Sequence, residues 1–194
     1  MTVMPMGIPS KGMTASEYLA WERTQRERHE YFRGETFLMA GGSPRHNALA
    51  AVIIRDLGMA TRGTPCRVLT SDQRIVTWPR EHYVYADASL VCGTFELAED
   101  TSDVLANPRA IFEVLSRSTE AYDRGDKWAA YRQIPSLTDY FLVSQSLPRI
   151  ECYRRQGKGW HYEVAEASGR IVLGEGFELD VDTLYDGVLA LPGE

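Results

Sequence analysis

The sequence has no apolar run that approaches the roughly 20 residues needed to cross a membrane. The first basic residue, Lys11, follows the mildly apolar start, whereas a signal peptide carries its charge before the apolar core. We therefore expect a cytoplasmic protein in which residues 1–12 form a loose tail ahead of a single domain over 13–194.

Cysteine is also scarce. The three cysteines, Cys66, Cys92 and Cys152, lie far apart and show no Cys-x-x-Cys spacing. This pattern gives no support for a zinc site, and for a cytoplasmic chain it predicts free thiols and no disulfide.

Basic residues are outnumbered: 21 Lys and Arg stand against 27 Asp and Glu, for a net charge of −6. This balance argues against a protein whose main task is to coat nucleic acid. It is still compatible with a nuclease, because metal-binding carboxylates count toward the sum and a local basic groove is enough. The sequence also has no Gly-x-Gly-x-x-Gly after a strand and no Walker-type loop, so nucleotide cofactors lose support.

Turn, cap and periodicity signals predict a mixed α/β or α+β layer fold with one sheet. Thr14 and Glu17 fit a capping box, Arg33-Gly34 a hairpin turn, and Ser43-Pro44 a helix start. In order, these signals predict a helix from Thr14, a hairpin over 30–40, a helix from Ser43 to about 62, strands over 66–78, 83–92 and 110–115, a helix over about 118–133, strands over 139–145, 149–155, 159–164 and 170–173, and a turn at 182–185.

Asp87 lies within Tyr83 to Cys92, a β-branched and aromatic run that reads as one strand. Aspartate is disfavoured in the middle of a strand. One interpretation is a half-exposed strand with Asp87 on its solvated face, and the other is a functional carboxylate.

Glu113 lies in Ala110 to Leu115, an apolar run typical of a buried central strand. A buried carboxylate needs a proton, a basic partner or a metal, so a structural salt bridge and a metal site both stay open. Lys127 shares a helix face with Asp123 and Tyr131. It forms either an exposed ion pair worth a few tenths of a kcal/mol or part of a site near the Glu113 strand.

Together these residues resemble the Uma-type family of endonucleases, within the PD-(D/E)xK restriction-endonuclease-like superfamily. The resemblance spans about Met13 to Tyr185. It is carried by these pieces: Ala86-Asp87, Glu113 to Ser116, Ser118-Thr119, Asp123, Lys127, Tyr131, Glu30 to Glu35, Ser43 to His46, and Pro135 to Tyr140.

The resemblance implies a restriction-endonuclease-like core: a central mixed β-sheet flanked by helices, followed by a C-terminal antiparallel hairpin region. Asp87 matches the aspartate of the PD motif and Glu113 the acidic residue of the second motif, and both would be ligands of Mg²⁺ or Mn²⁺. Leu115 stands where the motif lysine is usual, so the resemblance passes the role of that lysine to Lys127. Glu30 matches a further acidic site residue. Because members of the superfamily often form homodimers, the resemblance also implies a homodimer.

The leading hypothesis is therefore a metal-dependent endonuclease that hydrolyses DNA phosphodiester bonds, with His46 as a secondary candidate for a phosphate contact. The alternative, motivated by the acidic charge and by Leu115, is a catalytically reduced protein of this fold that serves as a dimeric interaction or nucleic-acid-binding module. A small-molecule enzyme is a third idea, supported only by the aromatic residues Tyr83, Tyr85 and Tyr131.

Overall fold

The computed structural model describes residues 12–77 and 81–194. The predicted N-terminal tail, apart from Gly12, and the end of the predicted 66–78 strand therefore lie outside the described residues. No helix in the described ranges is long and apolar enough to cross a membrane.

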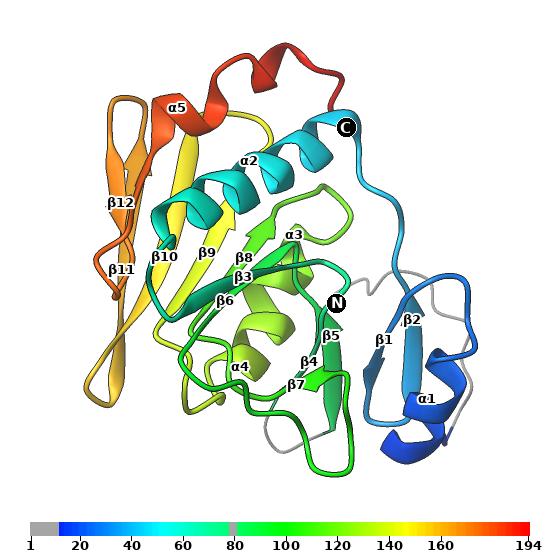
Figure 1. The fold of residues 1–194 in the computed structure, drawn as a ribbon. Helices are drawn as coiled ribbons and strands as arrows, with labels where there is room; N and C mark the ends of the chain where they lie inside the picture. The colour runs from blue at the N-terminus through cyan, green and yellow to red at the C-terminus, as the bar shows by residue number, and fades with distance from the viewer. Residues whose placement is uncertain (1–11, 78–80) are drawn as a thin grey trace.

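The larger of the two main sheets has six strands in the order β11-β10-β9-β8-β6-β3 (Figure 1). Neighbours in it are antiparallel except β8 and β9, which are parallel. The strands are β3 (Cys66–Thr70), β6 (Ala88–Cys92), β8 (Ala110–Val114), β9 (Asp139–Val143), β10 (Arg149–Gln156) and β11 (Gly159–Glu166).

A second sheet has five short strands in the order β2-β1-β5-β4-β7, and β12 and β13 form a small antiparallel sheet. These strands are β1 (His29–Phe32), β2 (Glu35–Leu38), β4 (Arg74–Val76), β5 (His82–Tyr85), β7 (Val104–Leu105), β12 (Arg170–Val172) and β13 (Glu178–Asp180). The mixed α/β class is as predicted, but the prediction of one sheet is wrong, because the 83–92 run divides at Ala86-Asp87 and its halves join different sheets.

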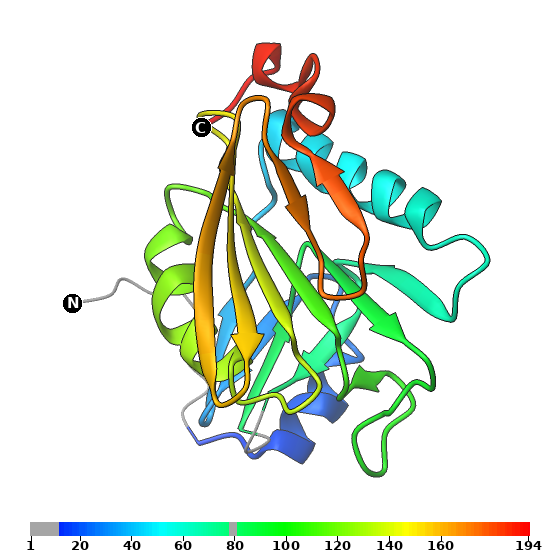
Figure 2. The same cartoon turned by 90° about the vertical axis from the view of Figure 1, so that its left-hand side faces the viewer.

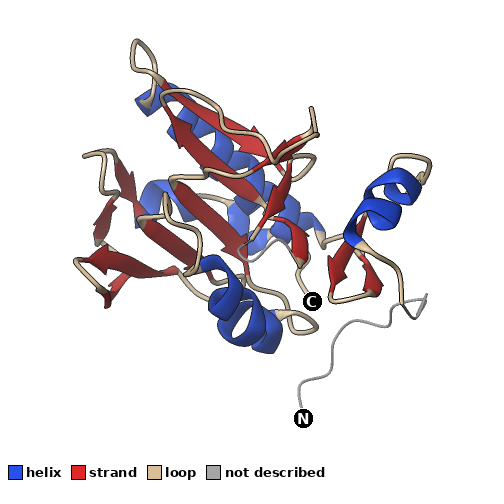
Figure 3. Cartoon of the chain, turned by 90° about the horizontal axis from the view of Figure 1, so that it is seen from below, coloured by secondary structure: helices blue, strands red, loops and turns tan. Residues whose placement is uncertain are grey.

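Helices cover both faces of the six-stranded sheet (Figure 2). On one face lies α2 (Pro44–Ala60). Two short elements near the C-terminus of the chain lie on the same side, namely α5 (Val181–Tyr185) and a 3₁₀ turn, η2 (Val188–Ala190). On the other face, α3 (Glu120–Tyr122), a π-helical turn η1 (Asp123–Lys127) and α4 (Trp128–Tyr131) follow one another without a break. Figure 3 shows α1 (Ala15–Glu22) beside the β1–β2 hairpin, away from these layers.

Local signals in the sequence account for several of these boundaries. The Thr14–Glu17 capping box forms at α1, and the Ser43 side chain accepts a hydrogen bond from His46 N at the start of α2. Arg33 and Gly34 both have positive φ, as a tight hairpin turn between β1 and β2 requires. These three predictions are confirmed.

The side chains of β8 alternate between the two helical layers. Ala110, Phe112 and Val114 belong to the apolar cluster that contains Leu49, Ile53 and Leu57 of α2. Ile111, and Leu115 directly after the strand, belong to a separate cluster that contains Tyr131. Because side chains alternate along a strand, Glu113 points toward the α3–α4 layer.

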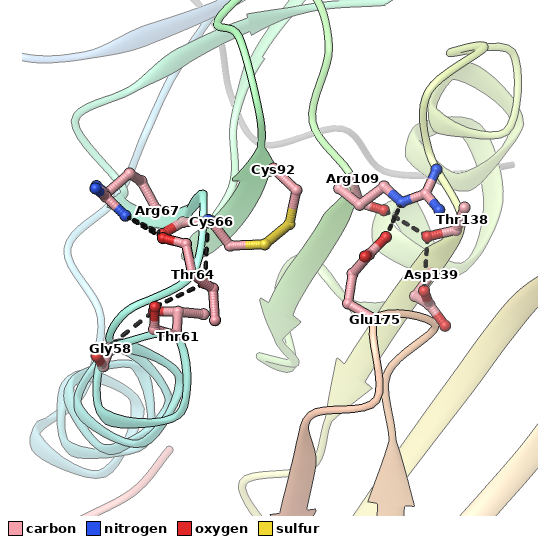
Figure 4. Close-up of a disulfide and its surroundings, with 10 residues drawn as sticks. All are labelled: Gly58, Thr61, Thr64, Cys66, Arg67, Cys92, Arg109, Thr138, Asp139 and Glu175. Carbon is pink, nitrogen blue, oxygen red and sulfur yellow. Dashed lines mark hydrogen bonds and ion pairs between the residues drawn. A yellow bond between two sulfur atoms is a disulfide. The ribbon is translucent and has the colours of Figure 1, made fainter.

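A disulfide joins Cys66 of β3 to Cys92 of β6 (Figure 4). The two residues are direct partners in the antiparallel β3–β6 pairing, and their Cα atoms are 3.9 Å apart. The prediction of free thiols is therefore wrong for this pair, because strand register brings together two cysteines that are 26 residues apart in sequence. Cys152 is free, as predicted, and it is buried.

Candidate active site

Asp87 lies at the two-residue break between β5 and β6, at the point where the chain passes from one sheet into the other. Its Oδ2 atom accepts a hydrogen bond of 2.7 Å from the backbone N of Val114 in β8. The side chain is only 17% exposed, and β5 and β6 are buried along almost their whole length. The interpretation of a solvated mid-strand aspartate is therefore wrong.

Glu113 is buried on β8, and two groups bind its Oε1 atom. Tyr131 Oη donates at 2.8 Å and Lys127 Nζ lies at 3.0 Å. Burial raises the pKa of Glu113 well above its ordinary value. The Lys127 charge opposes this rise, and the charges of Asp123, Asp87 and Glu30 add to it.

Lys127 ends the π-helical turn and is buried rather than exposed, so the interpretation of a surface ion pair is wrong. Its Nζ atom lies 3.0 Å from Glu30 Oε1, 3.0 Å from Glu113 Oε1 and 3.8 Å from Asp123 Oδ1. Burial opposes its charge, but these carboxylates outweigh burial and raise the pKa of Lys127 well above its ordinary value. Lys127 is therefore an ammonium at neutral pH.

Glu30 comes from β1, far away in the sequence, and completes this group. Its Oε1 atom accepts a hydrogen bond from Tyr85 N at 3.2 Å, and its Oε2 atom accepts one from Tyr122 Oη at 3.1 Å. The Tyr122 hydroxyl in turn lies 2.8 Å from His82 Nε2. Sequence reasoning missed Tyr122 and His82, since neither stands in a recognisable motif.

His46, in the first turn of α2, approaches the site from the opposite layer. Its Nε2 atom lies 3.3 Å from Asp87 Oδ2. Burial lowers the pKa of His46, but the hydrogen bond and charge of Asp87, with smaller contributions from Glu194 and Val114, raise it overall. A Cβ atom on Gly42 would lie 2.6 Å from His46 Nδ1, so the glycine leaves the space that the imidazole ring occupies. The sequence shows Gly41-Gly42 only as the end of a hairpin.

These side chains surround one cavity of about 320 Å³, which we call the carboxylate cavity. Five carboxylates line it, with one lysine and one histidine, and no arginine is among the described residues of its wall. The five are Glu30, Asp87, Glu113, Asp123 and Glu194. Burial, with Glu30 and Asp87 nearby, raises the pKa of Asp123 to about 6 despite Lys127 and Thr119. The excess negative charge therefore favours either protons or a cation at this site.

Of the aromatic residues behind the third idea, Tyr85 lines the carboxylate cavity and Tyr131 is bonded to Glu113. Tyr83 instead packs in the cluster of Tyr18 and Tyr31. No aromatic wall of the three tyrosines is formed.

The donor set of Asp87 and Glu113 suits a hard cation. No group of three or more His, Cys, Asp or Glu side chains in the described parts of the chain forms a ready cage for a metal. Mg²⁺ does not require such a cage, because it is commonly held by one or two carboxylates together with waters and substrate phosphates. The two carboxylates therefore fit Mg²⁺ or Mn²⁺ as a site completed by substrate.

Residues 15–184 match the Uma2 family, which is described as "Putative restriction endonuclease". Two similar proteins come from Synechocystis sp. (strain ATCC 27184 / PCC 6803 / Kazusa). The uncharacterized protein slr1290 is 35% identical over 93% of this chain and 95% of its own length. The uncharacterized protein sll1609 is 32% identical over 76% of this chain and 84% of its own length.

A crystal structure of a putative nuclease belonging to DUF820 from Anabaena variabilis ATCC 29413 has a similar fold. The TM-score is 0.75, with 16% sequence identity, over 91% of this chain and 99% of that one. At this identity the similarity bears on the fold alone, and the chain shares the fold of that protein.

Proposed function

Because the chain belongs to the Uma2 family, we propose that it is a divalent-metal-dependent endonuclease that hydrolyses DNA phosphodiester bonds in the carboxylate cavity. One observation carries the proposal: Asp87, from the β5–β6 break, and Glu113, from β8, line one cavity of excess negative charge together with Lys127, which contacts Glu113. This arrangement supplies two oxygen ligands and a fixed cation beside them.

In this proposal Asp87 and Glu113 are the residues that would hold Mg²⁺ or Mn²⁺. When bound, such an ion would supply an activated water and would offset charge that develops on phosphorus. The Val114 backbone N orients the Asp87 carboxylate, and Tyr131 and Lys127 orient that of Glu113. Tyr131 and Lys127 both contact Glu113 Oε1, so Glu113 Oε2 takes no part in these two contacts.

The proposed role of Lys127 is to position the attacking water and to stabilise negative charge in the transition state. Glu30 is a positioning residue, because it holds the ammonium group at 3.0 Å and is itself fixed by Tyr85 N and Tyr122 Oη. His46 contacts Asp87 and is placed to meet a phosphate at the start of α2.

Metal binding is the first test. We expect calorimetry with Mg²⁺ and Mn²⁺ to show binding to the wild type that Asp87→Asn and Glu113→Gln each abolish. The matched control is Asp126→Asn, because Asp126 is exposed on the same π-helical turn. Cleavage of supercoiled plasmid should need the metal and should be lost in both site variants and in Lys127→Ala.

A second function is favoured by one observation, namely that Lys127 already binds Glu113 and Glu30. The lysine could neutralise the carboxylates permanently, leaving a catalytically reduced interaction or nucleic-acid-binding module, as a homodimer. That candidate predicts DNA binding or dimerisation by a folded wild type that neither binds metal nor cleaves plasmid in either metal.

A further inference from the structure

A second cavity, of about 530 Å³, adjoins the carboxylate cavity and is rich in arginine. We call it the arginine cavity. It shares Ser116 and Glu194 with the wall of the carboxylate cavity, so the two are adjacent along one rim. Its wall holds four arginines, Arg45, Arg117, Arg124 and Arg149, against three glutamates.

The four arginines differ in how far neighbouring carboxylates neutralise their charge. Arg124 is bidentate to Glu151, at 2.7 and 2.8 Å, and also contacts Glu120 at 2.8 Å. Its role is structural, because geometry of this kind is the strongest that an arginine makes with a carboxylate. Arg45 donates to the carbonyls of Gln145, Leu189 and Leu191, which fix its guanidinium without neutralising it.

The positive charges of Arg117 and Arg149 are the ones that close carboxylates neutralise least. Arg117 is exposed, and within the described residues its guanidinium forms no hydrogen bond or ion pair. Arg149 makes two long ion pairs, 3.4 Å to Glu151 and 3.4 Å to Glu166, and also interacts with the Tyr162 hydroxyl, which carries no charge; its side chain is 36% exposed. Glu151 is already held by Arg124 and by the Tyr162 hydroxyl at 2.7 Å.

We propose that the arginine cavity binds the phosphate backbone of DNA next to the scissile bond, with Arg117 and Arg149 as the phosphate ligands. This inference rests on the proposed function, and it names where the substrate strand continues after it leaves the carboxylate cavity. The guanidinium fork matches phosphate geometry, and a local basic wall explains how a protein with a net charge of −6 can hold a polyanion.

Glu194 stands where the two cavities meet and opposes this binding. Its Oε2 atom accepts a hydrogen bond of 2.9 Å from the backbone N of Arg117, a donor that a phosphate oxygen could use equally well. Removing the charge of Glu194 should therefore strengthen DNA binding, whereas removing an arginine should weaken it. A folding defect cannot produce both signs.

The experiment measures fluorescence anisotropy of a labelled 20-base-pair DNA duplex in Ca²⁺, an oxygen-binding ion, over a series of salt concentrations. Arg117→Ala and Arg149→Ala should each weaken binding about three- to tenfold. Each should also lower the slope of log K against log salt by about one. Glu194→Gln should tighten binding. Thermal unfolding of each variant checks that the fold is kept.

The matched control is Arg62→Ala. Arg62 is exposed just beyond the C-terminal end of α2, while Arg45 stands at the other end, so the helix separates it from the arginine cavity by about 25 Å. Its removal should leave affinity and salt slope nearly unchanged.

The outcomes separate this inference from the proposed function. If the wild type binds and cleaves DNA but Arg117→Ala and Arg149→Ala bind as the wild type does, the arginine cavity is not the phosphate track and the nuclease proposal stands. Equal weakening by Arg62→Ala also overturns the inference, because binding would then follow total charge. If the wild type neither binds the duplex nor cleaves plasmid, both proposals fail.

Discussion

Lys127 Nζ lies 3.0 Å from Glu113 Oε1, and both side chains are about 95% buried. The ammonium group belongs to the π-helical turn η1, and the carboxylate belongs to β8, a central strand of the six-stranded sheet. A buried pair of this kind is costly to break from one side, because the remaining charge is left without a partner.

Lys127→Met should therefore destabilise the protein by about 3–5 kcal/mol. The loss arises because Glu30 and Glu113 both lose their ammonium partner. Urea denaturation at neutral pH measures it. Lys158→Met, at the exposed β10–β11 turn, is the control and should change stability by less than about 0.5 kcal/mol. Equal effects of the two substitutions would contradict a buried Lys127 pair.

Gly42→Ala should destabilise the protein by about 1–3 kcal/mol, because the new methyl group must displace the His46 ring. Gly41→Ala is the neighbouring control, since a Cβ atom there meets no other atom within 4 Å. In a double-mutant cycle, Gly42→Ala should cost much less in a His46→Ala background. A cost that stays the same in both backgrounds would show that the clash is not with His46.

His82 should make the stability depend on pH, because burial lowers the pKa of this histidine to about 4. An unfolded histidine titrates near 6.5. Between about pH 6.5 and 4 the unfolded chain binds this proton and the native chain does not, so stability falls as the pH falls through this window. The contribution of His82 is at most about 3 kcal/mol, and it levels off below pH 4.

The measurement is the free energy of unfolding between pH 4 and 7 for the wild type and His82→Gln, in which that part of the slope should disappear. His161→Gln, at an exposed position on β11, is the control and should keep the wild-type slope. Parallel curves for the wild type and His82→Gln would mean that the buried imidazole is not kept neutral.

The Cys66–Cys92 disulfide should stabilise the protein by about 3 kcal/mol, as expected for a loop closed over a separation of 26 residues. Removing both cysteines by Cys66→Ser/Cys92→Ser should lower the urea midpoint by a corresponding amount. Reductant should do the same to the wild type and nothing further to the double variant. Thiol labelling of the unfolded, unreduced chain should find one reactive cysteine, Cys152, and finding three would contradict the disulfide.

The elements that the sequence predicts well are those whose cause is local. A capping box needs only Thr14 and Glu17, and a hairpin turn needs only Arg33 and Gly34. The alternation of Arg149 to Arg155 and Gly159 to Val164 likewise predicts the β10–β11 hairpin, which the structure contains. In each case the interacting atoms lie within a few residues of one another.

The sequence names the residues of the candidate site but not their contacts. Asp87, Glu113, Lys127 and Glu30 are all named by the family resemblance, and all four line one cavity. Their burial, the Val114 N bond to Asp87 and the Tyr122 bond to Glu30 depend on elements that are distant in sequence. Metal binding and catalysis by these residues stay predictions.

The sequence by itself determined the local elements, the family and the chemical types that gather at the site. Only the tertiary structure decided that the chain changes sheets at Ala86-Asp87, that Cys66 meets Cys92, and that an arginine cavity adjoins the carboxylates. The physical reason is that strand register and layer packing are set by many contacts between distant segments. No short stretch of sequence contains both partners of such a contact.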